Sequence, residues 1–164
     1  MSDLNMIMGE EEFKVVDAEL KRLNEQVSAK VIFLVDKNGQ LIASVGETKG
    51  IDTTSLASLT AGNIAATAGM AQLLGQKEFS ILFHEGENDN IHIALVGSRM
   101  ILVTIFNNKS ALGIVRLRVK KSVEILGQVF ENIFKKVEKD RNSKQTSKSP
   151  FAEITEDDIE KLFG

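Results

Sequence analysis

Cysteine is absent from this sequence of 164 residues, and only two histidines are present. Without cysteine the chain forms no disulfide and offers no thiolate for nucleophilic or metal chemistry. Two histidines are too few for the usual protein-built zinc sites, although carboxylates leave a hard-metal site formally open. We therefore expect neither a metal nor another cofactor.

The sequence also lacks a long hydrophobic run and an excess of basic charge. No apolar stretch approaches the roughly 20 residues that a helix needs to cross a bilayer. The start, Met1 to Asn5, has neither the basic region nor the apolar run of a secretory signal. A net charge of −3 gives no general attraction to nucleic acid. We expect a soluble cytoplasmic protein that neither inserts into a membrane nor binds nucleic acid.

Enzyme motifs are missing as well. The sequence has no serine elbow, no cysteine nucleophile and no phosphate-binding loop of the GxxxxGK[ST] type. His84 and His92 fall on neighbouring predicted strands, where they could face one another near Glu85 and Asp89. Such a group could ligate a metal, but two surface histidines at a hairpin are the commoner outcome. We predict no catalytic residue and a non-enzymatic protein.

The chain does contain segments of clear periodicity, and its 43% of hydrophobic residues are enough for a core. Apolar residues recur at helical spacing in some segments and form β-rich runs in others. The predicted helices cover 10–27, 52 or 53 to about 74, and 110–138. The predicted strands cover 30–36, 41–45, 79–84, 91–96 and 100–106. Asn38-Gly39, between the first two strands, is typical of a tight hairpin.

Short turns between the strands indicate antiparallel pairing. The order of elements, α-β-β-α-β-β-β-α, predicts an α+β sandwich, in which one five-stranded antiparallel sheet carries helices on both faces. We expect one domain over residues 1–138, a disordered basic linker over 139–149 and an amphipathic C-terminal helix over 150–164.

The middle helix has two different faces at about 100° per residue. We expect one face to pack on the sheet; its members are Leu56, Leu59, Asn63, Ala66, Met70, Leu73 and Leu74. The other face carries almost no side chain; its members are Ser58, Ala61, Gly62, Ala65, Ala68, Gly69 and Gln72. Each helical glycine loses roughly 1 kcal/mol against alanine, so this face indicates close approach by another backbone. That backbone belongs to the same monomer, to a second copy or to a different protein.

The C-terminal segment has its own helix start and an apolar side. Thr155 is a candidate N-cap, with Asp158 three residues further on. The apolar side consists of Phe151, Ile154, Ile159, Leu162 and Phe163. Isolated helices shorter than roughly 12–15 residues are marginal in water, so this segment needs a groove. The groove lies on the chain's own body or, as we favour, on a partner.

Several runs of the sequence resemble the Roadblock/dynein light chain family, and within it the bacterial polarity regulators. The resemblance spans nearly the whole chain apart from the linker and the extreme N-terminus. Its specific parts are residues 29–43 (AKVIFLVDKNGQLIA), residues 51–66 (IDTTSLASLTAGNIAA) and the tail residues 149–154 (SPFAEI). Less specific matches are residues 83–86 (FHEG), 96–99 (VGSR) and 113–118 (GIVRLR).

The resemblance implies a homodimer in which two sheets join edge to edge and two middle helices lie side by side as a platform. It implies that one GTP-bound small Ras-like GTPase of the MglA type sits on two protomers, with Ala65 and Gly69 at positions that match the family's contacts. It further implies that hydrolysis rises without a donated arginine finger, and that the C-terminal helix binds the GTPase elsewhere and favours nucleotide release. Cell polarity, gliding motility and enrichment at a cell pole are the expected setting.

We therefore predict a non-catalytic regulator of a small GTPase with two contact elements. Its predicted contact residues are Ser58, Ala61, Ala65, Ala68 and Gly69 on the middle helix and Phe151, Ile154, Ile159, Leu162 and Phe163 on the tail. The alternatives are a non-catalytic scaffold and a ligand-sensing dimer that localises polarity proteins. An enclosed pocket with convergent polar groups would favour sensing.

Overall fold

The computed structural model describes residues 8–147 of the chain. Its helices are α2 (Glu10–Val27), α3 (Thr53–Leu73) and α4 (Leu112–Ser147). Its strands are β1 (Val31–Asp36), β2 (Leu41–Gly46), β3 (Ile81–Glu85), β4 (Asp89–Val96) and β5 (Met100–Asn107). The chain divides into one compact unit that ends at Phe130 and a second that begins at Glu131. The sheet, α2, α3 and the first half of α4 belong to the first unit.

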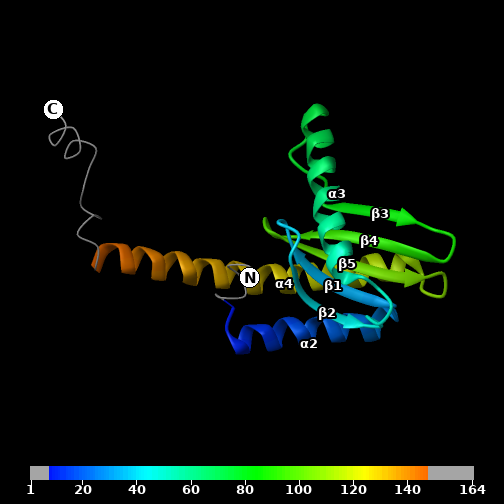
Figure 1. Ribbon diagram of the computed structural model, residues 1–164, viewed down its shortest axis with the longest axis horizontal. Coiled ribbons are helices and arrows are strands. Elements are labelled where there is room, and N and C mark those ends of the chain that lie inside the picture. The colour runs from blue at the N-terminus through cyan, green and yellow to red at the C-terminus, as the bar shows by residue number, and fades with distance from the viewer. Residues whose placement is uncertain (1–7, 148–164) are drawn as a thin grey trace. The chain divides into compact units, whose positions relative to one another are not determined.

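The strands form one five-stranded sheet in the order β2-β1-β5-β4-β3. All four pairings are antiparallel, so β2 and β3 are the edges. The helix α3 lies on one face of the sheet, and α2 and the first half of α4 lie on the other (Figure 1). The predicted α+β fold, with its element order and its helices on both faces, is confirmed.

The strand β1, which lies between β2 and β5, is buried along its whole length because both faces of the sheet are covered. Side chains of a strand alternate between the two faces. Phe33 therefore joins the core beneath α3, together with Ala57 and Ile64. The opposite core contains Leu20 of α2 and Leu126 of α4, both fully buried. Two cores hold the three helices against one sheet.

Local signals in the sequence determine several element ends. Asp52 caps α3, because its Oδ1 accepts a hydrogen bond from the backbone N–H of Ser55 at 3.0 Å. Gly75 follows the helix with a φ of +73°, the position that a C′ glycine takes. The turn between β1 and β2 is closed by Asp36, whose Oδ1 accepts from the backbone N–H groups of Asn38 and Gln40, each at 3.0 Å. The expected hairpin is confirmed.

The end of α4 differs from the expectation. The sequence predicts a helix that ends at residue 138 and a disordered linker over 139–149, whereas the structure has helix up to Ser147. Residues 139–147 contain no glycine or proline, and several of them are good helix formers, including Lys139, Arg141 and Gln145. High polarity alone therefore did not indicate disorder here. The predicted tail helix over 150–164 lies outside the described residues.

No helix within residues 8–147 is both long enough and apolar enough to cross a membrane.

Candidate functional site

The helix α3 is turned on its axis relative to the prediction. Its buried residues are Ala57, Thr60, Ala61, Ile64 and Ala71. The larger residues that we expected on the sheet are instead mostly in solvent: Leu59 is 69% exposed, Met70 60%, Leu73 90% and Leu74 68%. The prediction was wrong because α3 carries apolar residues around its circumference, so periodicity could not select the buried side. Small residues face the sheet because they let the helix approach it closely.

The predicted contact residues on α3 separate into two groups. Ser58, Ala65 and Gly69 are exposed, and Ala68 is half-buried. Ala61 is buried, with 9% of its surface exposed. Ala61 therefore presents little surface to a partner, and its role as a contact residue stays a prediction.

The β1–β2 turn explains the burial of Ala61. Gly39, in this turn, has a φ of +93°, and a Cβ built on it would lie 3.3 Å from Cα of Ser58 and 3.6 Å from Cβ of Ala61. The small residues at the start of α3 therefore let the chain's own backbone approach. At Ala61, packing within the monomer therefore accounts for the small side chain.

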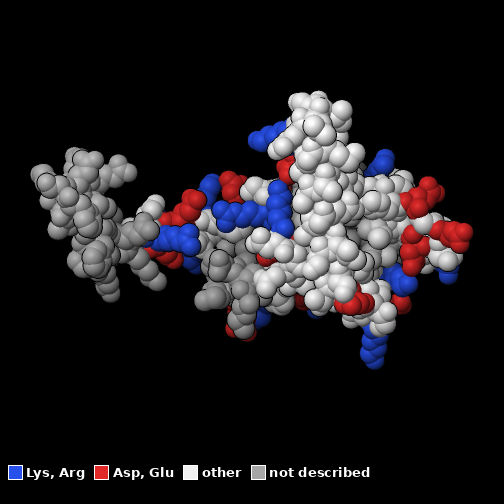
Figure 2. All heavy atoms as spheres, turned by 45° about the horizontal axis from the view of Figure 1, so that its top comes forward, with Lys and Arg blue, Asp and Glu red and all other residues white. Residues whose placement is uncertain are grey.

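The other half of the small face is open. A Cβ built on Gly62 or on Gly69 would meet no atom within 4 Å, and Ala65 lies between them on the same side of the helix. We call Ser58, Gly62, Ala65 and Gly69 the small surface. The whole of α3 contains no charged residue, and Figure 2 shows an uncharged band along it.

An exposed apolar stripe runs beside the small surface. It consists of Leu59, Met70, Leu73 and Leu74, and we call it the apolar ridge. Ile81, the first residue of the edge strand β3, is 50% exposed. Four large apolar residues in solvent on one helix, together with an unpaired strand edge, are features of an association surface. The sequence prediction missed the ridge because it placed these residues in the core.

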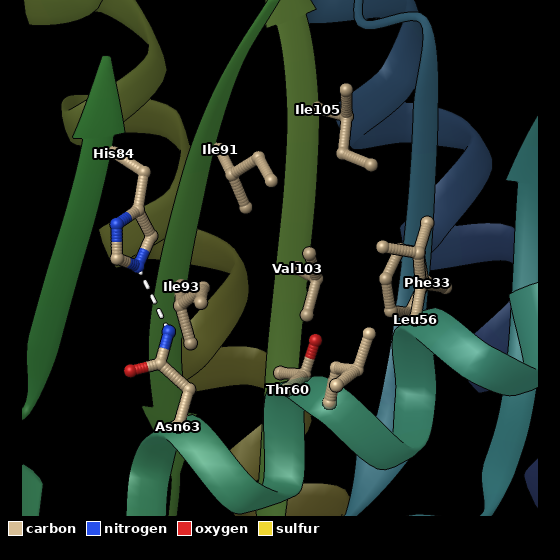
Figure 3. A pocket seen from close by; sticks show the side chains of 10 residues that line it. Phe33, Leu56, Thr60, Asn63, His84, Ile91, Ile93, Val103 and Ile105 are labelled. Carbon is tan, nitrogen blue, oxygen red and sulfur yellow. Dashed lines mark hydrogen bonds between the residues drawn. The ribbon is translucent and has the colours of Figure 1, made fainter. Parts of the chain in front are cut away.

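A small hollow of about 110 Å³ lies between α3 and the sheet. Its walls include Phe33 and Val103 from the sheet and Leu56 and Leu59 from α3. Asn63 and His84 meet at its rim, with 2.9 Å between Asn63 Nδ2 and His84 Nε2 (Figure 3). Apart from this pair and Thr60 the lining is apolar, which suits the side chain of a neighbouring molecule better than a polar ligand.

The two histidines do not face one another, which corrects the candidate pair. His84 is the partner of Ile91 across β3 and β4, whereas His92 is the partner of Phe83. Consecutive pairs point to opposite faces of a sheet, so His84 is exposed beside α3 and His92 is buried on the other side. Among the residues that the structure describes, no group of three or more histidine, aspartate or glutamate side chains could hold a metal ion.

His92 lies in an unusual environment. It is fully buried, and neither ring nitrogen has a hydrogen-bond partner. Its strand neighbour Thr104 is also fully buried, and its Oγ1 has no partner. Burial, and to a smaller extent the charge of Arg116, lowers the pKa of His92 from 6.5 to about 4. His92 is therefore neutral in the folded protein at neutral pH.

Comparisons with known proteins agree with this geometry. The chain is similar to the structure of MglB from Myxococcus xanthus, with 56% identity and a TM-score of 0.74 over 77% of this chain and 95% of that one. It is similar to the gliding protein MglB from Thermus thermophilus, with 29% identity and a TM-score of 0.72 over 76% of this chain and 93% of that one. A comparison with curated proteins found no match. The Roadblock/LC7 domain model matches residues 15–106, more than half of the sequence, and the chain belongs to the Roadblock/LC7 domain family.

Proposed function

We propose that this chain is a homodimeric, non-catalytic regulator of a small Ras-like GTPase of the MglA type, which raises GTP hydrolysis in cell polarity and motility. The observation that carries the proposal is the identity of 56% with Myxococcus xanthus MglB over 95% of that chain. An identity this high over nearly the whole of that chain, together with the same fold, supports a shared role.

The apolar ridge and β3 supply the proposed dimer contact. A second copy that pairs its own β3 with this edge would satisfy the free backbone groups of both strands. The same symmetric contact brings two copies of α3 together and covers Leu59, Met70 and Leu73 of each copy. A related structure, with 29% identity, is described as MglB with a tetrameric arrangement, so assembly of several copies occurs in this family.

The small surface supplies the proposed GTPase contact. Because Gly62, Ala65 and Gly69 have little or no side chain, a switch loop can approach the backbone of α3 closely. The GTPase carries its own catalytic groups, and hydrolysis depends on a positioned water and on stabilised charge at the γ-phosphate. A rigid surface that binds the hydrolysis-competent arrangement more tightly shifts the population toward it. No residue of this chain needs to take part in the chemistry.

The C-terminal segment is the second proposed contact with the GTPase. Phe151, Ile154, Ile159, Leu162 and Phe163, which lie outside the described residues, would bind away from the small surface and favour nucleotide release. Tethering to a dimer that already holds the GTPase raises the effective concentration of such a segment to the order of millimolar. A helix of weak intrinsic affinity would then still bind the GTPase.

The hollow beneath α3 bears on the alternative of ligand sensing. Its volume of about 110 Å³ is well below the roughly 300–1,000 Å³ of typical small-molecule sites. Its apolar walls offer few groups that would orient a ligand. The hollow supports a role in association rather than in sensing.

Single-turnover hydrolysis by the MglA-type GTPase of the same organism tests the proposal. The GTPase is loaded with GTP, and phosphate release is followed with increasing amounts of this protein. The account expects a faster single turnover that saturates at two protomers for each GTPase. An unchanged rate, together with measurable binding, would instead indicate a scaffold.

A further inference from the structure

The first turns of α4 present an exposed face that combines apolar and basic residues. Ile114 is 48% exposed and Leu117 is 60% exposed. Basic residues flank them on both sides of the helix, at about 100° per residue. These are Arg116, Arg118, Lys120 and Lys121, all exposed. We call these six residues the basic face of α4.

The orientation of this face is fixed by packing on the other side of the helix. Val115 and Val119 are buried. Ser122 is also buried, and its Oγ donates a hydrogen bond of 2.8 Å to Oε1 of Glu19 on α2. Residues that point away from this contact must point into solvent. The basic face also lies across the sheet from α3, and is therefore separate from the small surface and the apolar ridge.

The four cations of the basic face form no ion pair with any residue that the structure describes. Several other cations of the same unit are paired, among them Lys21 with Asp17, Lys30 with Asp89 and Lys37 with Glu78. Four neighbouring positive charges around exposed Ile114 and Leu117 repel one another. An acidic occupant with apolar side chains would relieve both the repulsion and the exposure.

The C-terminal segment of this chain, residues 150–164, has this composition. Its acidic residues are Glu153, Glu156, Asp157, Asp158 and Glu160, against one basic residue, Lys161. Its apolar residues are Phe151, Ile154, Ile159, Leu162 and Phe163. We propose that this segment of a second copy docks on the basic face of α4. The docking does not depend on the proposed function.

Overall charge disfavours an anionic lipid surface as the occupant. The chain as a whole carries a net charge of −3, so an anionic membrane attracts the basic face but repels the remainder of the molecule. The C-terminal segment of a second copy instead brings acidic and apolar side chains together to the basic face.

Hydrogen exchange on the full chain tests the docking. The amides of residues 151–163 should exchange at least about fivefold more slowly in the wild type than in Arg118→Glu with Lys121→Glu. The matched control is Lys49→Glu with Lys77→Glu, which makes the same change in charge at two exposed positions outside α4. The control should keep the protection of the wild type. Equal exchange of the segment in the wild type and the α4 variant would overturn the proposal.

Salt gives a second measurement on the unmodified protein. Raising NaCl from about 0.1 M to about 1 M shortens the Debye length from about 10 Å to about 3 Å. Protection of residues 151–163 should fall as salt rises, while that of the core strands should not. Segment protection that is independent of salt would contradict docking on a basic face.

Cross-linking identifies the site directly, because the chain has no cysteine. Leu117→Cys with Ile159→Cys should react with a short bismaleimide faster than the control pair Ala18→Cys with Ile159→Cys, in which Ala18 is an exposed residue of α2. Cross-linked chains of dimer mass support the docking, and a product of monomer mass alone would contradict it. Equal rates for the two pairs would overturn it. A second result would also overturn it: binding to phosphatidylserine vesicles that the Arg118→Glu, Lys121→Glu variant loses, together with equal exchange of the segment in the wild type and that variant.

Discussion

Asn63 of α3 and His84 of the edge strand β3 are joined by a hydrogen bond, with 2.9 Å between Asn63 Nδ2 and His84 Nε2 (Figure 3). This bond fixes the middle helix relative to the strand edge beside it. Both elements belong to the proposed dimer contact, so the bond holds two parts of one association surface in register.

Replacing His84 should therefore weaken the dimer without unfolding the monomer. His84→Ala removes one hydrogen bond, which contributes about 1 kcal/mol, and we expect the dimer dissociation constant to rise about fivefold. Sedimentation equilibrium across a dilution series measures this constant. Asn88→Ala, at an exposed position of the neighbouring turn, is the control. An unchanged constant for His84→Ala would show that the bond does not support the dimer.

The apolar ridge, together with Ile81 of β3, should be indispensable for dimerisation. Leu73 is 90% exposed and Ile81 is 50% exposed, so the fold of the monomer does not depend on either side chain. Burying one large apolar side chain contributes about 1.5–3 kcal/mol. Leu73→Glu with Ile81→Glu should thus give a monomer at micromolar concentration by light scattering.

The matched control for the ridge is Val15→Glu on α2, where the valine is 49% exposed. This variant should remain a dimer. If the Leu73→Glu, Ile81→Glu protein is still a dimer, the apolar ridge is not part of the dimer contact.

Deleting residues 149–164 should separate the two proposed activities. We expect dimerisation and most of the stimulated hydrolysis to remain, because the apolar ridge and the small surface are intact. Nucleotide release from the GTPase should slow toward its intrinsic rate. A fluorescent nucleotide reports the release, and equal rates with the truncated and the full chain would argue against a role of the segment in exchange.

His92 should make the fold less stable in mild acid. Its pKa is lowered from 6.5 to about 4 in the folded protein, so the unfolded chain binds a proton in this window and the folded chain does not. The stability that neutral His92 contributes is therefore fully present above about pH 6.5 and is lost as the pH falls toward 4. At about 1.4 kcal/mol for each pKa unit, the loss between pH 7 and pH 5 is roughly 2 kcal/mol.

Urea unfolding at these two pH values measures the effect. His92→Leu should have a smaller loss of unfolding free energy between pH 7 and pH 5, by roughly 2 kcal/mol. Asn88→Ala, at an exposed position whose side chain does not titrate, should keep the loss of the wild type. A His92→Leu protein with the full pH dependence would show that another group is responsible.

The sequence predicts the fold well because its signals are local. Asn38-Gly39 identifies the first hairpin, Asp52 identifies the start of α3, and β-rich apolar runs identify the strands. The rotation of α3 could not be predicted in the same way, because Leu59 and Leu73 are as apolar as any core residue. Only the position of the helix over the sheet shows that they point outward.

The candidate site was predictable in part. The residues with little side chain stand out in the sequence, and the structure leaves Ala65 and Gly69 exposed. The burial of Ala61 depends on a turn that is distant in sequence, at Gly39. The separation of His84 from His92 depends on strand register, and a shift of one residue decides which face each side chain takes.

The most direct test of the central claim is single-turnover GTP hydrolysis by the MglA-type GTPase with Ala65→Arg, Gly69→Arg in place of the wild-type protein. The double variant should stay folded, because both positions are exposed and a Cβ at Gly69 meets no atom within 4 Å. Its matched control is Ala18→Arg with Gln26→Arg, at two exposed positions of α2 on the other face of the sheet. The account predicts that the control accelerates hydrolysis like the wild type and that the α3 variant does not. Full acceleration by a folded, dimeric α3 variant would contradict it.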